Sequence, residues 1–477
     1  MPSRESIQLV AQYANIYYLR LASLKTALEK SAVEKWSAHA SHTSRVLDVV
    51  QGDLTWIVGT IYMDMPLKPQ VLQDLVADVN LSASVPTKSW RDPRADSIQI
   101  EDESGRLSIV GHKLQEHTLC TGIVVAVLGS ETTSGEFDVI DILYPGVDIS
   151  DILKSAEHQE LASTDHTEST TTSSQLRFNG GLQPSGHAED DYVAVISGLN
   201  LSGKEHAGLN VDLLVDYLTG DLLTTWACDK RANICTLVIL GNSMDAASIV
   251  DDDAMSRKLT KNKKYGYDSA LYNARPVEVF DDFLDSICKS IDVVLLPGDR
   301  DPTNTTLPQQ PINKIMLRKS SYYCSSTLSL TTNPAFFTIN ERTIFGTAGQ
   351  NIEDLKHYVS GATTTVEATP GNEDDNRNYE PLDLAVETLK WGHFAPTAPD
   401  TLWTYPFSDR DPFIIDSCPD IYLIGNQAHY GERLVDIKKD SSKVCRVVMI
   451  PEFSSAGEVV LINMRTLASE VIKFGSE

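Results

Sequence analysis

Apolar residues recur at helical spacing through the first part of the chain. They stand three or four residues apart, at Leu9, Tyr13, Ile16, Tyr17, Leu21, Leu24 and Leu28. This period places them on one face, so the pattern predicts one or two amphipathic helices over residues 9–36. The polar face lacks the dense Lys and Arg content of a membrane-surface helix. We therefore expect residues 1–43 to form a helical arm that packs on the next domain.

A different pattern begins near residue 50, where short apolar runs of strand type follow one another. Residues 54–63 predict one strand, whereas residues 97–111 and 119–146 each predict a pair of strands around a glycine-containing turn. Several short strands with glycine at their bends are typical of a small closed barrel, which we place at residues 44–150.

Such a barrel could bind either nucleic acid or protein. Its basic residues are few, namely Lys88, Arg91, Arg94, Arg106 and Lys113, and no stacking aromatic residues alternate with them. This weak electrostatic footprint favours a structural or protein-binding barrel.

Residues 151–190 are rich in Ser and Thr and lack periodicity, which predicts a linker. Residues 251–264 and 366–380 are predicted to be inserted loops. The first loop holds the densest basic cluster, Arg257, Lys258, Lys261, Lys263 and Lys264, next to three aspartates. A solvated charge run is the favoured interpretation of this cluster, and a DNA contact is the alternative.

Residues 191–477 show a third pattern, in which predicted strands alternate with predicted helices. Four β-branched runs each end in a polar loop that contains glycine, within residues 192–200, 236–245, 293–301 and 420–431. Helix-like segments lie between them, so we expect a layered α/β domain. Function in such sheets sits at the carboxyl ends of the strands, which predicts one shared rim for the four loops.

The chemistry available on this rim is limited. Gly198, Gly203 and Lys204 have the spacing of a phosphate-binding loop, but Glu205 stands where Ser or Thr must hold Mg²⁺. No G-x-S-x-G nucleophile elbow is present. A binuclear metal site is the sharper hypothesis, since the loops carry Asp245, Asp299 and Asp301. Among the eleven histidines, only His429 lies in one of these loops.

Length, charge and cysteine content limit the class of protein further. The chain has 477 residues, 42 % of them hydrophobic, which suggests two or three packed domains. Its formal net charge of −26 opposes polyanion binding by the surface as a whole. Seven cysteines without a C-x-x-C pair indicate a reducing compartment. No signal-peptide core and no membrane-length apolar run is present, so we expect an intracellular soluble protein.

Several stretches resemble a known family. They are LPGDRDPTNTTLPQQP, LTTNPAFFTI, GTAGQNIEDL, HFAPTAPDTLWTYPFSDRDPFII and VVMIPEFSSAG. Together they resemble the B-subunit family of replicative DNA polymerases and, within it, the delta branch. The resemblance implies a mixed α+β chain: an oligonucleotide/oligosaccharide-binding (OB) barrel at residues 44–150 and a calcineurin-like phosphoesterase α/β sandwich at residues 191–477.

The resemblance also places five metal-site motifs of the active relatives on this chain. The corresponding positions are Gly198, Asn200, Asn242, Asp245, Asp299, Arg300, Asp301, Ala348, Asn426 and Ala428. The D-x-H motif falls on Gly198 and Asn200, and the G-D-x-x-D motif has Asn242 in place of the Asp expected to bridge the metals. The G-H-x-H motif falls on Asn426 and Ala428, so both histidines are missing.

The remaining two motifs are also altered. The G-N-H-[DE] motif has Arg300 in place of the catalytic His, and the lone His falls on or near Ala348. A guanidinium cannot ligate a cation. We therefore expect no metal, no cofactor and no catalysis, and we expect Arg300 to pair with Asp299, Asp301 and Asp245 in place of the metals.

The family then implies a noncatalytic accessory subunit in the nucleus, serving replication, repair and translesion synthesis. The implied partners are the cysteine-rich C-terminal module of the delta catalytic subunit, the third delta subunit and the polymerase zeta catalytic subunit. Contact with the sliding clamp and with DNA would be indirect, and no membrane is involved. Two alternatives stay open: an active phosphoesterase or 3′–5′ exonuclease like the archaeal small subunits, and a DNA-binding module acting through the barrel and residues 257–264.

Overall fold

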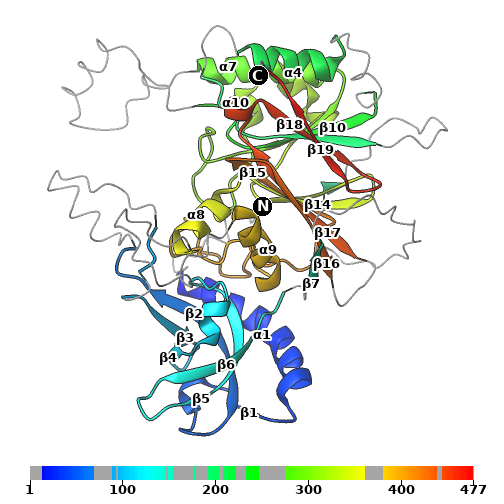
Figure 1. Cartoon of the computed structure of the whole chain (residues 1–477). Coiled ribbons are helices and arrows are strands. Elements are labelled where there is room, and N and C mark those ends of the chain that lie inside the picture. The colour runs from blue at the N-terminus through cyan, green and yellow to red at the C-terminus, as the bar shows by residue number, and fades with distance from the viewer. Residues whose placement is uncertain are drawn as a thin grey trace, which may run out of the picture. The chain divides into compact units, whose positions relative to one another are not determined.

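The computed structural model forms two compact units (Figure 1). Unit 1 comprises Met1–Asp151, Asn351–Cys418 and Asp436–Ser442, and unit 2 comprises Ile152–Gln350, Pro419–Val435 and Lys443–Glu477. The structure describes residues 13–68, 89–92, 95–146, 149–153, 176–177, 191–202, 208–221, 232–245, 274–359, 380–437 and 443–475. Leu9, Gly203, Lys204, Glu205, the basic cluster at residues 257–264, the loop at residues 366–379 and most of the predicted linker lie outside these residues.

Unit 1 contains the predicted barrel. Its strands are β1 (Ser41–His42), β2 (Thr55–Asp64), β3 (Ser97–Glu101), β4 (Arg106–Val110), β5 (Val124–Glu131) and β6 (Phe137–Leu143). They hydrogen-bond in the order β1-β2-β3-β4-β6-β5, and β5 also pairs with β2, which closes the sheet. The short elements η2 (Val46–Asp48) and α3 (Lys113–Glu116) connect these strands. The prediction of a small closed barrel is therefore confirmed.

The predicted arm forms one helix, α1 (Ala14–Trp36). Its apolar face packs on β2 and β5, where Leu24 and Leu28 share a buried cluster with Trp56 and Val124. Burial of this face holds the helix on the barrel, because apolar area removed from water contributes about 25 cal/mol per Å². Tyr13 departs from the prediction, since its side chain is exposed.

Arg20 lies on this same buried face of α1 and is fully buried. Its Nε atom donates to Asp411 Oδ2 at 2.7 Å. Its two Nη atoms donate to the main-chain carbonyls of Gly122, Pro396 and Ala398 at 2.7–3.0 Å. A single guanidinium thus ties the helix, the barrel and the segment around residue 400 into one unit, with its charge paired and its donors satisfied.

His393 completes the buried cluster around Asp411. Its Nε2 atom lies 2.9 Å from Asp411 Oδ2. Burial, together with the nearby Arg20 charge, lowers the pKa of His393 to about 4, so the imidazole is neutral near pH 7. Burial opposes the Asp411 charge, but His393 and Arg20 outweigh this effect and hold the pKa of Asp411 well below its usual range.

Two further helices belong to the later part of unit 1, α8 (Gln350–Val359) and α9 (Pro381–Trp391). Helix α9 starts with a proline, which suits the first helical turn, and with a capping box between Glu380 and Asp383. It ends at Gly392, which adopts the left-handed conformation with a φ of 63°. The compact units place residues 351–418 with the barrel, whereas the domain boundaries drawn from sequence stay a prediction.

Unit 2 contains two sheets. The first has the order β12-β11-β10-β9-β18-β19. Its strands are β9 (Tyr192–Ile196), β10 (Ile234–Leu240), β11 (Asp292–Leu296), β12 (Leu328–Leu330), β18 (Glu458–Asn463) and β19 (Ser469–Lys473). Strands β9 to β12 are parallel, and the apolar runs of β9, β10 and β11 are buried as expected for a covered parallel sheet.

The second sheet has the order β7-β16-β17-β15-β14-β13-β8. Its strands are β7 (Ile149–Leu153), β8 (Leu176–Arg177), β13 (Ala335–Ile339), β14 (Arg342–Thr347), β15 (Ile421–Gln427), β16 (Gly431–Ile437) and β17 (Val444–Pro451). Strands β7 and β8 lie within or beside the stretch predicted to be a linker.

The two sheets of unit 2 pack face to face. Val195 and Val238 of the first sheet share a buried cluster with Ile344 and Leu423 of the second. The outer face of the first sheet is covered by α4 (Leu209–Thr219) and α7 (Arg275–Ile287), as Figure 1 shows. The short elements η4 (Lys314–Met316), η5 (Ser320–Ser325) and α10 (Phe453–Ala456) complete the unit. The predicted layered α/β architecture is confirmed, and its assignment as a phosphoesterase sandwich stays a prediction.

Two findings concern the chain as described. No helix in the described residues is long and apolar enough to span a membrane. The six cysteines within the described ranges are all free thiols, and Cys228 lies outside them.

Candidate functional site

The polar loops predicted to share a rim do meet in unit 2. The loop after β9 bonds to the loop after β10, since Gly198 N donates to Gly241 O at 3.0 Å. The loop after β11 approaches so closely that a Cβ atom on Gly298 would lie 2.2 Å from Asn242 Oδ1. Only glycine fits there, because real Cβ atoms do not approach other heavy atoms within 3.0 Å. The prediction of one shared rim is confirmed.

Three asparagines on this rim adopt the left-handed backbone conformation. Their φ angles are 47° at Asn200, 51° at Asn242 and 55° at Asn426. Asn is the non-glycine residue that enters this region most readily, together with Asp, because its short side chain can hydrogen-bond locally. Sharp turns of the rim are thus made by Asn residues at three of the positions that were predicted to match metal-site motifs.

Asn426 connects the two sheets at the rim. Its Nδ2 atom donates to Leu240 O at 3.0 Å and to Ala348 O at 2.8 Å. Leu240 is the last residue of β10, and Ala348 directly follows β14. Its main-chain N–H donates to Ser197 Oγ at 2.9 Å. The amide supplies two donors on one nitrogen, which a neutral imidazole cannot do. Asn426 therefore serves as a structural bridge between the two sheets.

Asp301 is buried against the main chain of the neighbouring loop. Its Oδ1 atom accepts from Met244 N at 3.0 Å, and its Oδ2 atom accepts from Gly298 N at 2.8 Å. Burial raises the pKa of Asp301 to about 7, although the hydrogen bonds from Gly298 and Met244 lower it. Both carboxylate oxygens are engaged by backbone N–H groups, so the side chain fixes the two loops.

Arg300 does not neutralise the rim carboxylates, and that prediction is wrong. Its Nη1 atom donates to Asn200 Oδ1 at 3.3 Å, and its main-chain N–H donates to Asn242 Oδ1 at 3.2 Å. The side chain is exposed, and it makes no ion pair with Asp299, Asp301 or Asp245 among the described residues. The reason is that backbone donors already satisfy Asp301, so burying a guanidinium beside it would add desolvation without a free acceptor.

An amide cluster beneath the rim was not predicted from the sequence. Gln309 Nε2 donates to Gly298 O at 3.1 Å and to Asn304 O at 3.0 Å. Gln309 Oε1 accepts from Asn333 Nδ2 at 2.7 Å and from Gln350 Nε2 at 3.1 Å. The signal was available, because polar amides stand inside otherwise buried, proline-bounded stretches, and buried amides need partners. The cluster holds the loop of Gly298 in place.

The donor set of the rim does not fit a pair of divalent metal ions. No group of three or more His, Cys, Asp or Glu residues in the described ranges is placed to hold a metal. Asp301 is committed to backbone N–H groups, and Arg300 cannot act as a ligand. Asn426 Oδ1 is a buried acceptor without a hydrogen-bond partner, but one amide oxygen cannot replace a carboxylate and histidine ligand set.

Unit 1 offers a different kind of surface. Trp403, Tyr405 and Phe407 form an aromatic ridge, in which the Trp403 side chain is 70 % exposed and the Tyr405 and Phe407 rings pack at 5.4 Å. The segment has no regular secondary structure, yet it is anchored at both ends. Thr401 Oγ1 donates to Asp354 Oδ2 at 2.7 Å before the ridge, and Asp411 is held by Arg20 after it. The segment that carries the ridge is thus held by hydrogen bonds on both sides of it.

Two protein families match successive parts of the chain. Residues 12–142 match the family described as the DNA polymerase delta subunit OB-fold domain, and residues 193–432 match the DNA polymerase alpha/epsilon B-subunit family. The chain is 34 % identical to the DNA polymerase delta small subunit of Arabidopsis thaliana, over 98 % of this chain and 92 % of that protein.

Two more relatives show how far the likeness extends. The DNA polymerase delta small subunit of Saccharomyces cerevisiae is 32 % identical, over 97 % of this chain and 89 % of that protein. The DNA polymerase II small subunit of Pyrococcus horikoshii is 22 % identical, over 50 % of this chain and 34 % of that protein. The likeness to the delta proteins therefore covers nearly the full chain, whereas the archaeal likeness covers half of it.

Proposed function

Because the chain belongs to the DNA polymerase delta small subunit family, we propose that it is the noncatalytic accessory subunit that bridges two other subunits of the delta complex. One partner is the cysteine-rich C-terminal module of the catalytic subunit, and the other is the third subunit. The complex works in the nucleus, in replication and in repair synthesis, and the chain also serves the catalytic subunit of polymerase zeta. Its link to the sliding clamp and to DNA is indirect.

The rim of unit 2 is the observation that supports a noncatalytic role. Its architecture suits an inactive calcineurin-like phosphoesterase, since two packed sheets bring polar loops together at the carboxyl ends of their strands. The side chains at the ligand positions are engaged in fixing the loops, as Asn426 and Asp301 show. A hydrolase of this kind needs those lone pairs for metal ions and an activated water.

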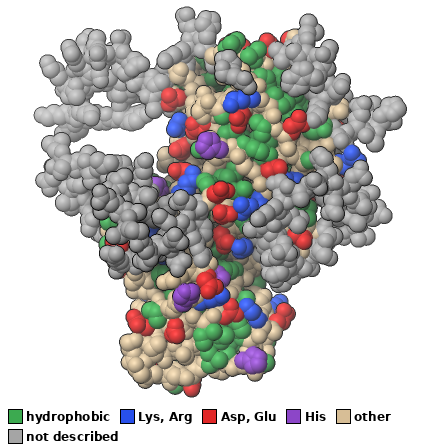
Figure 2. All heavy atoms as spheres, viewed as in Figure 1, with side chains coloured by type: hydrophobic (Ala, Val, Ile, Leu, Met, Phe, Trp, Pro, Cys, Tyr) green, Lys and Arg blue, Asp and Glu red, His purple; other side chains and the backbone are tan. Residues whose placement is uncertain are grey.

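The surface supports protein partners better than DNA. On the face shown in Figure 2, acidic and basic side chains of the described residues are interspersed, without a continuous basic stripe. The net charge of −26 opposes phosphate binding. Exposed aromatic residues are enriched at protein interfaces, and the ridge exposes Trp403 and Tyr405.

Co-purification tests the proposal. The full chain is co-expressed with the C-terminal module of the catalytic subunit, and separately with the third subunit, and each mixture is analysed by size-exclusion chromatography. We expect a stable complex in both cases. Failure of the full chain to form a complex with either partner would contradict the proposed function. We expect replacing Trp403 and Tyr405 by Ala to weaken one of the two complexes by about tenfold or more.

A further inference from the structure

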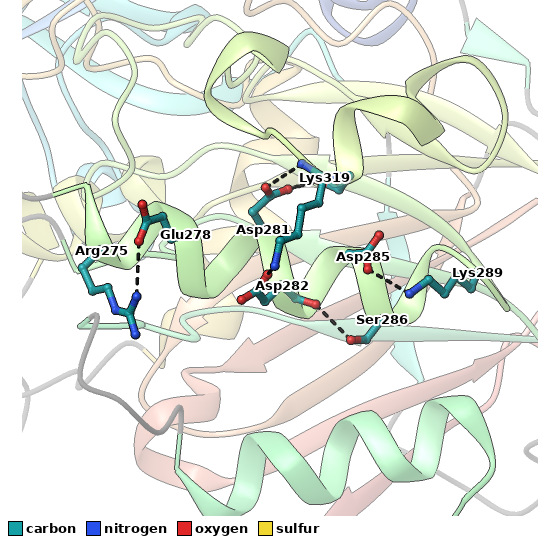
Figure 3. Close-up of polar contacts among 9 residues, drawn as sticks. Arg275, Glu278, Asp281, Asp282, Asp285, Ser286, Lys289 and Lys319 are labelled. Carbon is teal, nitrogen blue, oxygen red and sulfur yellow. Dashed lines mark hydrogen bonds and ion pairs between the residues drawn. The ribbon is translucent and has the colours of Figure 1, made fainter.

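A short segment of unit 2 is fixed on helix α7 by one buried carboxylate. Asp281 Oδ1 accepts from the N–H and the Oγ of Ser320, at 2.9 and 2.6 Å, and Asp281 Oδ2 accepts from Lys319 N at 2.8 Å. These bonds cap the start of η5 and hold it on the helix (Figure 3). The segment therefore presents a defined surface, although it contains only two short 3-10 helices.

The exposed carboxylates of α7 are all engaged with local cations. Glu278 pairs with Arg275 at 3.3 Å, and Asp285 pairs with Lys289 at 2.8 Å. Asp282 pairs with the ammonium group of Lys319, which reaches across from the segment (Figure 3). These carboxylates of α7 are thus paired with Arg275, Lys289 and Lys319, and none of them pairs with another cation of the segment.

Those other cations are Lys314 and Arg318. Both side chains are exposed, and neither forms an ion pair with any residue that the structure describes. Residues 310–326 contain no carboxylate. In a chain of net charge −26, this is a local positive surface.

Two large apolar side chains are exposed on the same short segment as these cations. Ile315 is 80 % exposed and Tyr322 is 85 % exposed, while Leu317 of the same segment is fully buried. Met316 and Tyr323 pack on the core of unit 2 from the same two 3-10 helices. The segment thus directs one set of apolar residues inward and displays another, and the displayed set gains from burial only when a partner covers it.

We infer that Lys314, Ile315, Arg318 and Tyr322 form a docking patch for an acidic, apolar segment of another subunit of the delta complex. The inference rests on the proposed function and names a surface for one of its partners. Carboxylates next to aliphatic or aromatic side chains complement this patch, because no described residue pairs with Lys314 or Arg318, and Ile315 and Tyr322 are largely exposed among the described residues. Arg and Tyr are also the residues that most often dominate binding energy at interfaces.

Single-stranded nucleic acid is the less favoured occupant. Tyr322 could stack on a base, but two uncompensated cations neutralise few phosphates, and α7 places carboxylates close by. An aliphatic side chain as exposed as that of Ile315 is better matched by an apolar protein side chain.

Two double variants of the full chain test the patch. Ile315→Ser with Tyr322→Ser removes the apolar part, and Lys314→Glu with Arg318→Glu reverses the charge. Leu209→Ser is the matched control, because Leu209 is 71 % exposed in the same unit and α4 carries no Lys or Arg. Affinity is measured by titration calorimetry against the purified catalytic subunit, the purified third subunit and, by fluorescence anisotropy, a labelled oligothymidylate. Thermal unfolding confirms that each variant is folded.

We expect both double variants to lose about tenfold or more in affinity for the same subunit, with the control unchanged. In the unaltered chain salt should weaken that binding, whereas in the charge-reversed variant salt should no longer weaken it, because salt then screens a repulsion. Unchanged affinity of both variants for both subunits would overturn the patch while leaving the proposed function intact. If the unaltered chain bound neither subunit, the two proposals would fall together. If only oligothymidylate binding were lost, the patch would be assigned to nucleic acid.

Discussion

Two buried carboxylates, Asp411 in unit 1 and Asp301 in unit 2, are accommodated in opposite ways. Asp411 faces a buried guanidinium and an imidazole, and its pKa is held well below the usual range. Asp301 faces only uncharged backbone N–H groups, and burial raises its pKa to about 7. An ion pair favours the charged form of a carboxylate, whereas burial without a cation disfavours it.

The difference bears on function. The pair of Arg20 and Asp411 joins segments 391 positions apart, so its role is to assemble unit 1. Asp301, at a position that was predicted to match a metal-site motif, joins two adjacent loops of the rim.

The largest effect is expected from breaking the ion pair in unit 1. Asp411→Asn keeps the shape of the side chain but leaves the Arg20 charge buried without a counter-ion. We expect the stability of unit 1 to fall by about 3–5 kcal/mol. Urea unfolding followed by tryptophan fluorescence measures this, since five of the six tryptophans belong to unit 1.

Glu101→Gln is the matched control for that variant. Glu101 pairs with Arg106 at 2.6 Å in the same unit, but the Arg106 side chain is half exposed. An exposed pair contributes at most about 1 kcal/mol, so the control should shift the unfolding midpoint little. Equal shifts in the two variants would show that the buried pair stabilises unit 1 no more than the exposed pair does.

A smaller effect is expected at the carboxylate of unit 2. Asp301→Asn replaces one acceptor by an N–H₂ group, which then faces a backbone donor at Met244 or Gly298. We expect a loss of about 1–3 kcal/mol and faster hydrogen exchange at both amides. Asp299→Asn, at an exposed neighbour, should change stability by less than about 0.5 kcal/mol. Indistinguishable behaviour of the two variants would contradict the scaffold role of Asp301.

The pH dependence should differ in sign between the two units. Unfolded His393 binds a proton below about 6.5, whereas folded His393 does so only below about 4, so unit 1 loses stability as the pH falls through this window. Folded Asp301 keeps its proton up to about 7, whereas the unfolded residue releases it near 3.8, so its contribution to unit 2 is lost as the pH rises through that window.

Each group changes the free energy of unfolding by about 1.4 kcal/mol per pH unit where it differs by one proton. The urea midpoint of unfolding is measured at pH 5 and at pH 7 for the unaltered chain, His393→Gln and Asp301→Asn. The change that each variant removes is the contribution of its group to the pH dependence of stability. Retention of the unit 2 slope in Asp301→Asn would show that another group produces it.

Much of the fold could be predicted from the sequence because the hydrophobic period is strong. The helical period around Leu21 and Leu24, and the apolar runs that become β9, β10 and β11, placed the arm, the barrel and the layered unit correctly. The grouping of residues 351–418 with the barrel has no signal in the hydrophobic pattern, because it depends on contacts between segments far apart in sequence.

The site was predicted less well than the fold. The loops were identified, but Arg300 was expected to fill the place of the metals, whereas backbone N–H groups satisfy Asp301. Backbone donors leave no mark in a sequence. Arg20 did leave one, since it stands four residues after Ile16 and four before Leu24 on the apolar face. A charge in that position signals a buried partner, although it does not say which one.

Calorimetric titration of the full chain with Mn²⁺ at neutral pH tests the noncatalytic role most directly. Because Asp301, Asn242 and Asn426 are committed to holding the loops of the rim, we predict no saturable, stoichiometric binding of Mn²⁺. Binding of one or two Mn²⁺ ions per chain that is lost in Asp301→Asn would contradict this, and it would restore an active metal-dependent phosphoesterase as the better account of the rim.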